Sequence, residues 1–414
     1  MKNEKLKMKN DVLSFWDFIK NKPLYYKKID HKRVHKAYEV LEPHIKKPLV
    51  IHVVGTNGKG STGRIMACLL HYSNYKVGHF SSPHILKFNE RIWIEGEDIS
   101  DSGLEVAHAK LYGILGEDIC NRLSYFEYTT LLALVAMQEL DIIVLEAGLG
   151  GEFDATNVVS KELSVITPIG LDHQDFLGDS IEAIATTKLN SIEKRVILGI
   201  QPNREVYRIA DKIAKERGVK IYSMLMFGTK VSDSKIAKLG SDGFSLGNSI
   251  LAITKELGWS HYLYENTLLA ISALESLNLS YDIQNIKNIR LFGRFYSIAS
   301  NVIIDVGHNL LSADAIAIAL EQKFGKNKVV LVYNSLDDKD YSSILKRLQK
   351  HIKRVEIIPI QSSRAVNVEI LQEKLRELTI GCKEFKTINK YENYLVFGSF
   401  FVVEAFIKKK LLQI

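Results

Sequence analysis

The stretch VVGTNGKGST at residues 53–62 combines three glycines, one lysine and three hydroxyl-bearing side chains. It follows the apolar, β-branched run PLVIHVV (48–54), which predicts a buried strand, and leads into GSTGRIMACLLHY (60–72), which predicts a helix. A turn from a strand into a helix presents free N–H groups and the positive end of the helix dipole, and glycine lets an anion approach the main chain. The stretch therefore predicts a loop that binds phosphate.

The lysine and the hydroxyl groups of this stretch have the chemistry of a nucleotide site. Lys59 would reach the β- and γ-phosphates, and the hydroxyl of Ser61 or Thr62 could ligate a Mg²⁺ that bridges the same oxygens. A strict Walker A sequence would have glycine where this chain has Val53, so a glycine-rich turn without a ligand is the alternative. The predicted cofactor-binding residues of the stretch are Gly55, Thr56, Asn57, Gly58, Lys59, Gly60, Ser61 and Thr62.

The composition is that of an ordinary globular chain. With 414 residues, 46% hydrophobic and 25% charged, we expect two domains, or three at most. The best apolar run (129–137) is too short to cross a bilayer, so we expect a soluble protein without a membrane partner. Three scattered cysteines predict neither disulfides nor a zinc site, which favours a reducing cytoplasm. The net charge of +7 is spread over mixed lysines and acids and indicates no nucleic-acid partner.

Strand-like and helix-like runs alternate along the chain, a pattern typical of a mostly parallel sheet. The strand-like runs of the first part are 75–80, 141–146, 163–169, 195–200 and 219–224. Residues 225–255 predict short antiparallel strands or surface loops, and residues 264–279 predict a helix. A second alternating series begins near residue 300, with strand-like runs at 328–334, 354–360 and 394–400.

This pattern predicts an α/β fold of two domains. A P-loop-type, mostly parallel sheet domain (residues 1–295) would be followed by a smaller Rossmann-like α/β domain (residues 296–414). In such sheets ligands bind at the carboxyl ends of the strands, so residues just past each strand-like run would share one rim. In the first domain these residues are Lys59, Ser61, Ser81, Ser82, Glu146, Asp172 and His173.

Two residues of this rim are candidate metal ligands. Glu146 ends a buried strand and is followed by a glycine-rich loop, and a carboxylate beside a phosphate loop suits Mg²⁺. The alternative for Glu146 is a glutamate at the edge of the core, paired with a lysine. His173, in LDHQ, could be a hydrogen-bonded loop residue, but next to Glu146 it becomes a plausible ligand.

A set of motifs, in order and spacing, resembles the folylpolyglutamate synthase/dihydrofolate synthase family of the Mur ligase superfamily. The motifs are GTNGKGST, SSPHILKFNERI, FEYTTLLAL, LEAGLGGEFDATN, LDHQDFLG, GRF (293–295), DVGHN (305–309), DDKDY (337–341) and GSF (398–400). The resemblance implies ATP-dependent ligation, in which a substrate carboxylate takes the γ-phosphoryl group of ATP and the amine of L-glutamate attacks the acyl phosphate. It implies ATP and Mg²⁺ as cofactors.

The resemblance also implies roles for individual residues. The implied residues are Lys59, His173 and Lys188 for catalysis; Ser61, Ser82, Glu146 and His173 for two Mg²⁺ ions; and Asn266, Arg294, Asp305 and His308 for the nucleotide. Asn266 is expected to open a helix, where asparagine is also a common cap. Lys188 matches a lysine that can be carbamylated in the family, but TTKLNSIEK (186–194) lacks the Ala-Gly pair that usually follows that lysine.

The implied substrates are dihydropteroate, folates and L-glutamate, handled by a monomer. YFEYTTL (125–131) and FDATN (153–157) resemble the bifunctional bacterial enzymes and imply a pterin side formed by Phe126, Asp154 and Ala155. Phe126 could instead be a core aromatic, whereas we expect Asp154 in an open loop rather than in the core.

Three alternatives stay open. They are a folylpolyglutamate synthase without the first activity, a cell-wall Mur ligase that acts on a UDP-linked precursor, and a nucleotide-regulated binding protein without ligase activity. About fifty residues precede Gly55, fewer than a UDP-binding domain would need. A binding protein would have no need for Glu146, His173 and Asp305 together.

Overall fold

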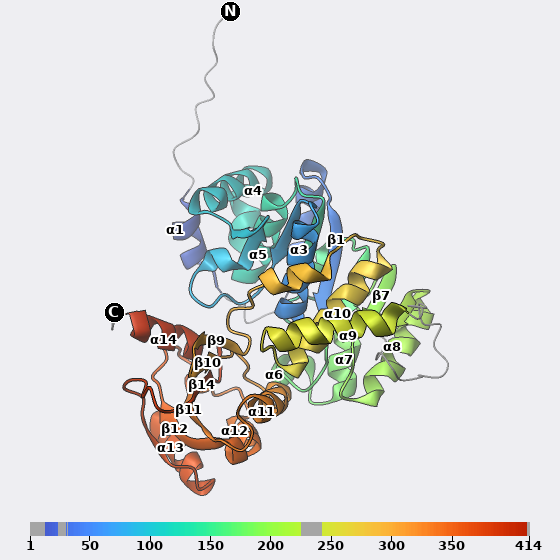
Figure 1. Cartoon of the computed structure of the whole chain (residues 1–414). Helices are drawn as coiled ribbons and strands as arrows, with labels where there is room; N and C mark the ends of the chain where they lie inside the picture. The colour runs from blue at the N-terminus through green and yellow to red at the C-terminus, as the bar shows by residue number, and fades with distance from the viewer. Residues whose placement is uncertain (1–12, 24–29, 31, 225–241, 412–414) are drawn as a thin grey trace, which may run out of the picture.

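The structure is a computed structural model and describes residues 13–23, 30, 32–224 and 242–411. Its strands form two sheets, each flanked by helices (Figure 1). We call the part of the chain up to residue 295, around the first sheet, the first lobe, and the part from residue 296 on the second lobe. The second lobe, drawn in orange and red in Figure 1, lies beside the first. No helix in the described part of the chain is both long and apolar enough to cross a bilayer.

The first lobe is built on an eight-stranded sheet. Its strands are β1 (Leu49–Val54), β2 (Val77–Phe80), β3 (Ile92–Ile94), β4 (Glu97–Asp98), β5 (Ile142–Glu146), β6 (Leu163–Ile166), β7 (Arg195–Leu198) and β8 (Lys220–Ser223). The order is β4-β3-β2-β5-β1-β6-β7-β8, and only the β2–β3 and β3–β4 pairs are antiparallel. Val53 of β1 is in register with Glu146 of β5 and Val165 of β6, so the loops after these strands meet at one edge of the sheet.

Helices cover both faces of this sheet because its central strands bury side chains on both sides. The helices are α1 (Phe15–Lys20), α2 (Arg33–Leu41), α3 (Lys59–Tyr72), α4 (Asp101–Arg122), α5 (Tyr125–Ala136), α6 (Gln174–Leu177), α7 (Ile181–Leu189), α8 (Arg204–Arg217), α9 (Asp242–Glu256) and α10 (His261–Ser276). The short 3₁₀ helices are η1 (Glu42–His44), η2 (Phe88–Arg91), η3 (Ala155–Val158) and η4 (Ile283–Asn288). Val50 and Val54 of β1 join the core with α2, α4, α5, α7 and α8, whereas Ile51 and Val53 join the core with α3, α9 and α10.

One sequence prediction in this lobe is wrong. Residues 242–256 form the helix α9 rather than strands or loops, and residues 225–241 lie outside the described ranges. Leu246, Ile250 and Ile253 recur at helical spacing and pack into the core beside α10, which outweighs the glycines and serines of the segment. The next helix, α10, begins three residues earlier than its predicted start at Tyr264.

The second lobe is built on a six-stranded sheet in the order β13-β12-β11-β14-β10-β9, which is parallel except for the β9–β10 pair. The strands are β9 (Tyr296–Ala299), β10 (Val302–Ile304), β11 (Val329–Tyr333), β12 (Ile352–Ile357), β13 (Cys382–Glu384) and β14 (Tyr394–Phe397). The helices are α11 (Leu310–Phe324), α12 (Tyr341–Leu348), η5 (Gln349–His351), α13 (Val368–Glu377) and α14 (Phe400–Leu411). Helices α11, α12 and α13 share one core and α14 packs on the other face of the sheet. The predicted α/β fold class is therefore confirmed.

Candidate active site

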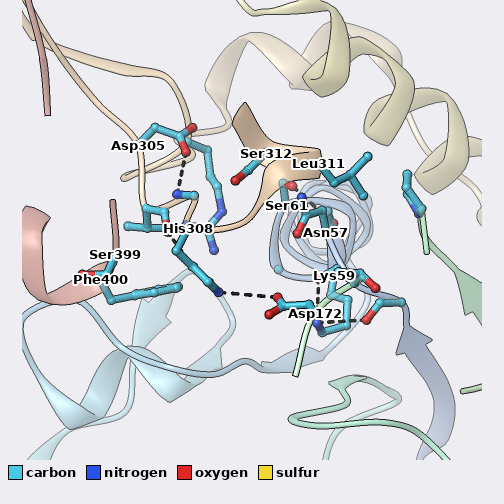
Figure 2. Close-up of a pocket in the computed structure, with 18 of the residues that line it drawn as sticks. Asn57, Lys59, Ser61, Asp172, Asp305, His308, Leu311, Ser312, Ser399 and Phe400 are labelled. Atoms are coloured by element: carbon cyan, nitrogen blue, oxygen red, sulfur yellow. Dashed lines mark hydrogen bonds and ion pairs between the residues drawn. The ribbon is translucent and has the colours of Figure 1, made fainter. Parts of the chain in front are cut away.

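A cavity of about 390 Å³ lies between the two lobes (Figure 2). It is lined by most of the residues that the sequence singles out: Gly55, Thr56, Asn57, Gly58, Lys59, Gly60, Ser61, Ser82, Glu146, His173, Lys188, Asn266, Arg294, Asp305 and His308. Thr62, Phe126, Asp154 and Ala155 are not among its lining residues. The folded chain thus brings the phosphate loop, the strand-end carboxylate and the second lobe's polar groups to one place.

The phosphate loop owes its shape to two glycines. A Cβ on Gly55 would lie 2.0 Å from the hydroxyl oxygen of Thr167, so no larger residue fits. Gly58 takes a left-handed conformation (φ 88°) at the start of α3, where a Cβ would lie 2.7 Å from the Oδ1 of Asn266. The loop therefore turns tightly enough for the first N–H groups of α3 to face the cavity.

Lys59 is not held by a carboxylate in this loop. Its Nζ donates to the carbonyl oxygens of Gly55 and Thr56, both at 3.2 Å. The Ser61 hydroxyl donates to the carbonyl of Gly58 at 3.2 Å. Because neutral carbonyl oxygens hold the lysine, a phosphate could take their place with a gain in charge pairing.

Ser61 and Thr62, which the sequence left as alternatives, differ in the structure. Ser61 lines the cavity, whereas Thr62 is fully buried and its hydroxyl has no hydrogen-bond partner among the described residues. Successive helix residues point about 100° apart, so the two hydroxyls face different surroundings. This geometry favours the Ser61 hydroxyl over the Thr62 hydroxyl as a ligand of the nucleotide's Mg²⁺, and the assignment of both residues to the nucleotide stays a prediction.

Glu146 is 5% exposed at the end of β5 and accepts a hydrogen bond from the backbone N–H of Ser82 at 3.3 Å. Burial raises its pKa, and the nearby cations Lys59 and Arg294 oppose this effect. Within the described ranges it forms no ion pair shorter than 4 Å, so it is not the lysine-paired edge glutamate of the alternative. A carboxylate held in the cavity without a paired lysine is suited to bind a metal ion, including a cation that is also bound to phosphate.

Burial lowers the pKa of both His173 and Lys188, which makes the first neutral and the second partly neutral at pH 7. Burial lowers the pKa of His173 to about 4, so its ring is neutral at pH 7. Lys188, 4% exposed on α7, donates to the carbonyl of Gly55 at 2.9 Å. Burial, with the charge of Lys59 nearby, lowers its pKa to about 7. A lysine with this pKa is partly the neutral, nucleophilic amine at physiological pH.

Asn266 is not a helix cap. It lies in the second turn of α10, whose N-cap is Ser260, and its side-chain amide donates to the Ser61 hydroxyl at 2.8 Å. The expectation that it opens the helix is wrong because α10 begins at His261. Its buried amide instead sets the position of a predicted Mg²⁺ ligand.

Asp305 joins the second lobe to the first. One carboxylate oxygen accepts from the Tyr262 hydroxyl at 2.7 Å and from the Phe295 N–H at 2.8 Å, and the other accepts from the Gly307 N–H at 2.8 Å. Burial raises its pKa, and the Tyr262 hydrogen bond and Arg294 oppose this effect. Asp305 lines the cavity (Figure 2), and its carboxylate already has these three donors.

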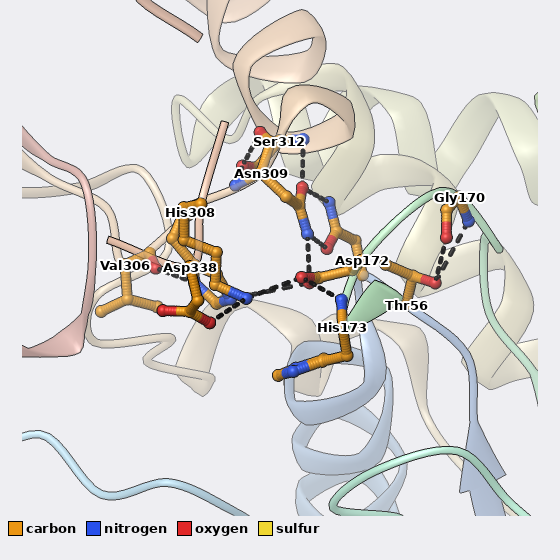
Figure 3. Close-up of polar contacts among 12 residues, drawn as sticks. Thr56, Gly170, Asp172, His173, Val306, His308, Asn309, Ser312 and Asp338 are labelled. Atoms are coloured by element: carbon orange, nitrogen blue, oxygen red, sulfur yellow. Dashed lines mark hydrogen bonds and ion pairs between the residues drawn. The ribbon is translucent and has the colours of Figure 1, made fainter. Parts of the chain in front are cut away.

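Asp172 is the main functional candidate that sequence reasoning left without a role. Its carboxylate accepts from two groups of the second lobe, the Lys339 Nζ and the Asn309 Nδ2, both at 2.8 Å, and lies 3.7 Å from the His308 Nε2 (Figure 3). Burial alone would raise its pKa, but the cationic groups around it hold that pKa well below the usual range. Asp172 lies in the motif LDHQ and Lys339 in the motif DDKDY, but no sequence pattern indicates that the two side chains form an ion pair.

The residues predicted for the pterin side lie behind the loop that follows Glu146. Asp154 is 5% exposed, and its carboxylate accepts from the N–H groups of Leu149 (2.8 Å) and Thr156 (3.0 Å) and from the Thr156 hydroxyl. Asp154 therefore lies in the predicted loop, but contrary to expectation it is buried there, because these donors compensate for the burial of its carboxylate. Phe126 packs against Gly148, where a Cβ would lie 2.5 Å from the ring, and Ala155 is buried. Their role toward a substrate stays a prediction.

A phosphate loop with its lysine, a carboxylate at the next strand end and a second lobe reaching the same cavity define a nucleotide-dependent transfer enzyme. The family model of the Mur ligase middle domain matches residues 53–273. The dihydrofolate synthase/folylpolyglutamate synthase of Buchnera aphidicola subsp. Schizaphis graminum is 32% identical over 380 residues, covering 86% of this chain and 87% of that protein.

Solved structures agree with this match. Helicobacter pylori folylpolyglutamate synthetase is 36% identical, with a TM-score of 0.73 and coverage of 96% of this chain and 98% of that one. The bifunctional folylpolyglutamate synthase/dihydrofolate synthase of Yersinia pestis, solved with AMPPNP and a Mn ion, is 25% identical, with a TM-score of 0.77 and 97% coverage of both chains. The chain is an ATP-dependent ligase and belongs to the dihydrofolate synthase/folylpolyglutamate synthase family of Mur ligases.

Proposed function

We propose that this chain joins L-glutamate to dihydropteroate, and later to reduced folates, in a reaction driven by ATP. The observation that carries the proposal is the meeting of Lys59, Glu146 and His173 from the first lobe with Asp305 and His308 from the second in one cavity. The names of the Buchnera relative and the Yersinia structure include both activities, which supports two acceptors.

In the proposed reaction the acceptor carboxylate attacks the γ-phosphorus of ATP and ADP leaves. The amine of L-glutamate then attacks the acyl phosphate, so that an amide forms and phosphate leaves. Such transfers depend on positioning and on neutralising charge. Lys59 and the N–H groups at the start of α3 would hold the phosphates, and Arg294 and Lys339, which line the same cavity, add positive charge.

The donor set of the cavity fits a divalent metal. Ser61 would hold the Mg²⁺ of the nucleotide, and Ser82, Glu146 and neutral His173 would hold a second one, all of them lining the same cavity. Within the described ranges no three His, Cys, Asp or Glu side chains gather to hold a metal, so hydroxyl and phosphate oxygens would have to complete the shell. When bound, Mg²⁺ would offset the negative charge that develops on the transferred phosphoryl group.

Two further parts of the proposal concern the chain as a whole. We propose that residues 1–295 and 296–414 are its two domains and that a single chain suffices, since both halves of the cavity come from one chain. A chain truncated after residue 295 would then show no glutamate-dependent release of phosphate. The free cysteines Cys68, Cys120 and Cys382 support a reducing cytoplasm as its location.

The experiment is to incubate the full chain with ATP, Mg²⁺, L-glutamate and one acceptor at a time, and to weigh the products by mass spectrometry. A gain of one glutamate residue on dihydropteroate and on a folate is expected. A gain on the folate alone would leave the folylpolyglutamate synthase alternative, which the name of the Helicobacter structure favours. Phosphate release that does not depend on glutamate would contradict ligation altogether.

A further inference from the structure

A second cavity, of about 330 Å³, adjoins the active site. The two cavities share the walls formed by Gly60, Ser61, Ser82, Pro83, Glu146, Arg294 and Phe400. The side walls of the second cavity come from residues that the proposed reaction does not use, chiefly Arg64, His79, Ser81 and Arg290. We call it the side cavity.

Arg64 is the unusual residue of the side cavity. Its guanidinium lies 4.9 Å from the centre of the Trp93 ring, and burial lowers its pKa. Among the described residues it makes no hydrogen bond and no ion pair shorter than 4 Å. An arginine has five N–H donors in a fork that matches a carboxylate, and those of half-buried Arg64 line the side cavity without a protein partner.

His79 is a second unpaired polar residue on the wall of the side cavity. It is 1% exposed, it lines the side cavity, and neither ring nitrogen has a hydrogen-bond partner among the described residues. Gly63 makes room for it, because a Cβ there would lie 2.5 Å from the Nε2. Both ring nitrogens are enclosed by the protein, with Nε2 against α3, so His79 adds an unpaired polar group to the wall beside Arg64 and makes no contact of its own with the cavity's interior.

The acidic residues of the side cavity do not pair with Arg64. The carboxylate of Glu90 is taken up by the backbone N–H groups of Ile85 (2.7 Å), Leu86 (2.9 Å) and Lys87 (2.8 Å). Glu146 belongs to the wall shared with the active site, and Asp98 lies near Arg64 without an ion pair below 4 Å. The guanidinium is thus open to an anionic ligand.

We infer that the side cavity binds the α-carboxylate of the terminal glutamate of a folate acceptor through Arg64. The inference rests on the proposed function. The carboxylate that reacts must lie near Glu146 and Ser82, and in a terminal glutamate the α-carboxylate is four carbon–carbon bonds away, about 5 Å. Arg64 is one helical turn, about 5–6 Å, from Gly60, whose Cβ position is 3.2 Å from the Glu146 Oε2.

This placement makes Arg64 a specificity residue. Dihydropteroate ends in a benzoate, whose one carboxylate is the reacting group, so it has nothing for Arg64 to bind. A folate has both carboxylates. Arg64 would therefore serve the addition of glutamate to folates and be dispensable for the first addition, to dihydropteroate.

The test compares Arg64→Met with the unaltered full chain on both acceptors, because methionine can still pack on Trp93 but cannot pair with a carboxylate. The KM for a monoglutamyl tetrahydrofolate should rise about tenfold or more, and the KM for dihydropteroate should stay within about twofold. Arg208→Met, which alters an exposed arginine of α8, is the matched control and should change neither value.

A second arm uses a folate whose α-carboxylate is converted to the amide. The unaltered chain should lose about tenfold in kcat/KM on this analogue, and Arg64→Met should lose no more on it than it has already lost. An equal rise in KM for both acceptors, or an unaltered chain indifferent to the amide, would overturn the inference. If the unaltered chain is active on folate but inactive on dihydropteroate, only the two-acceptor proposal is overturned, because the comparison with the amide still tests the role of Arg64. If the unaltered chain is inactive on both acceptors, both proposals are overturned.

Discussion

The phosphate loop and the cluster around Asp172 face the same cavity but are built in opposite ways. In the loop, Lys59 and Ser61 bond to carbonyl groups three or four residues away. In the cluster, Asp172 bonds to Asn309 and Lys339, which are 137 and 167 residues away. The loop holds a cation on neutral oxygens, whereas the cluster holds a cation on a carboxylate. The loop is therefore ready for a phosphate, and the cluster holds the lobes together.

The largest effect is expected in the loop. Lys59→Ala should lower kcat about 10³-fold, because a charge that neutralises the transferred phosphoryl group is lost. The free energy of unfolding should change by less than about 0.5 kcal/mol, since among the described residues the Lys59 ammonium donates hydrogen bonds only to carbonyls of its own loop. Steady-state ADP release and urea unfolding measure the two, with Lys76→Ala, at an exposed position, as control. Turnover near that of the unaltered chain would refute the phosphate-loop assignment.

In the cluster around Asp172 we expect the reverse, namely a larger effect on the free energy of unfolding than on turnover. Asp172→Asn should lower the free energy of unfolding by about 3 kcal/mol, because the buried Lys339 ammonium loses its 2.8 Å partner. The pKa of Asp172 is lowered in the folded chain, so its contribution is present above the unfolded pKa near 4 and is lost as the pH falls through the folded pKa. In urea unfolding, the difference in free energy between the unaltered chain and Asp172→Asn should therefore be smaller below pH 4 than at pH 7.

Asp338→Asn is the matched control for this variant, since Asp338 is more exposed and lies 3.5 Å from the same lysine. Its effect should stay below about 1 kcal/mol. Equal losses in the two variants would contradict the view that Asp172 is the anchor between the lobes.

Lys188 interacts with both regions, because it donates to Gly55 of the phosphate loop and the charge of Asp172 acts on it. We expect an effect of intermediate size on turnover. With its pKa lowered to about 7 by burial, its neutral fraction rises between pH 6 and pH 8. If it forms a carbamate, added bicarbonate should raise turnover more at pH 8 than at pH 6, and Lys188→Gln should lower turnover roughly tenfold. The carbamate carbon would be seen by ¹³C NMR after exposure to labelled bicarbonate. The exposed Lys194 serves as the comparison. The absence of a carbamate signal from Lys188 at pH 8 would refute the modification.

The smallest effect is expected one residue beyond Ser61. Thr62→Val should leave kcat within about twofold and should not lower the free energy of unfolding, because the buried Thr62 hydroxyl has no partner to lose among the described residues. Ser61→Ala should lower kcat by about tenfold or more if Ser61 holds the nucleotide's metal. Parallel kinetics of the two variants check this. Equal losses would contradict the preference for Ser61 over Thr62 as the metal ligand.

Local chemistry accounts for what the sequence could predict. A β-branched run, a glycine turn and an apolar helix identify the loop around Lys59, and the strand end places Glu146 beside it, as the register of β1 and β5 bears out. These features depend on neighbours in the chain or on the rule that parallel strands end at one edge.

What the sequence could not predict depends on distant partners. No local pattern pairs Asp172 with Lys339, buries the carboxylate of Asp154, or places Arg64 in the side cavity, because each depends on how separate segments pack. The helix α9 was missed for a related reason. Burial of Ile250 and Ile253 against α10 overrides a composition typical of loops.

The acyl phosphate is tested most directly by following an oxygen label from the acceptor carboxylate. Dihydropteroate labelled with ¹⁸O in its carboxylate is incubated with the full chain, ATP, Mg²⁺ and L-glutamate, and the released phosphate is analysed by mass spectrometry. If the carboxylate attacks the γ-phosphorus and glutamate then displaces phosphate, each ligation transfers one labelled oxygen to inorganic phosphate. Unlabelled phosphate accompanying amide formation would contradict the acyl phosphate and, with it, the chemistry assigned to this cavity.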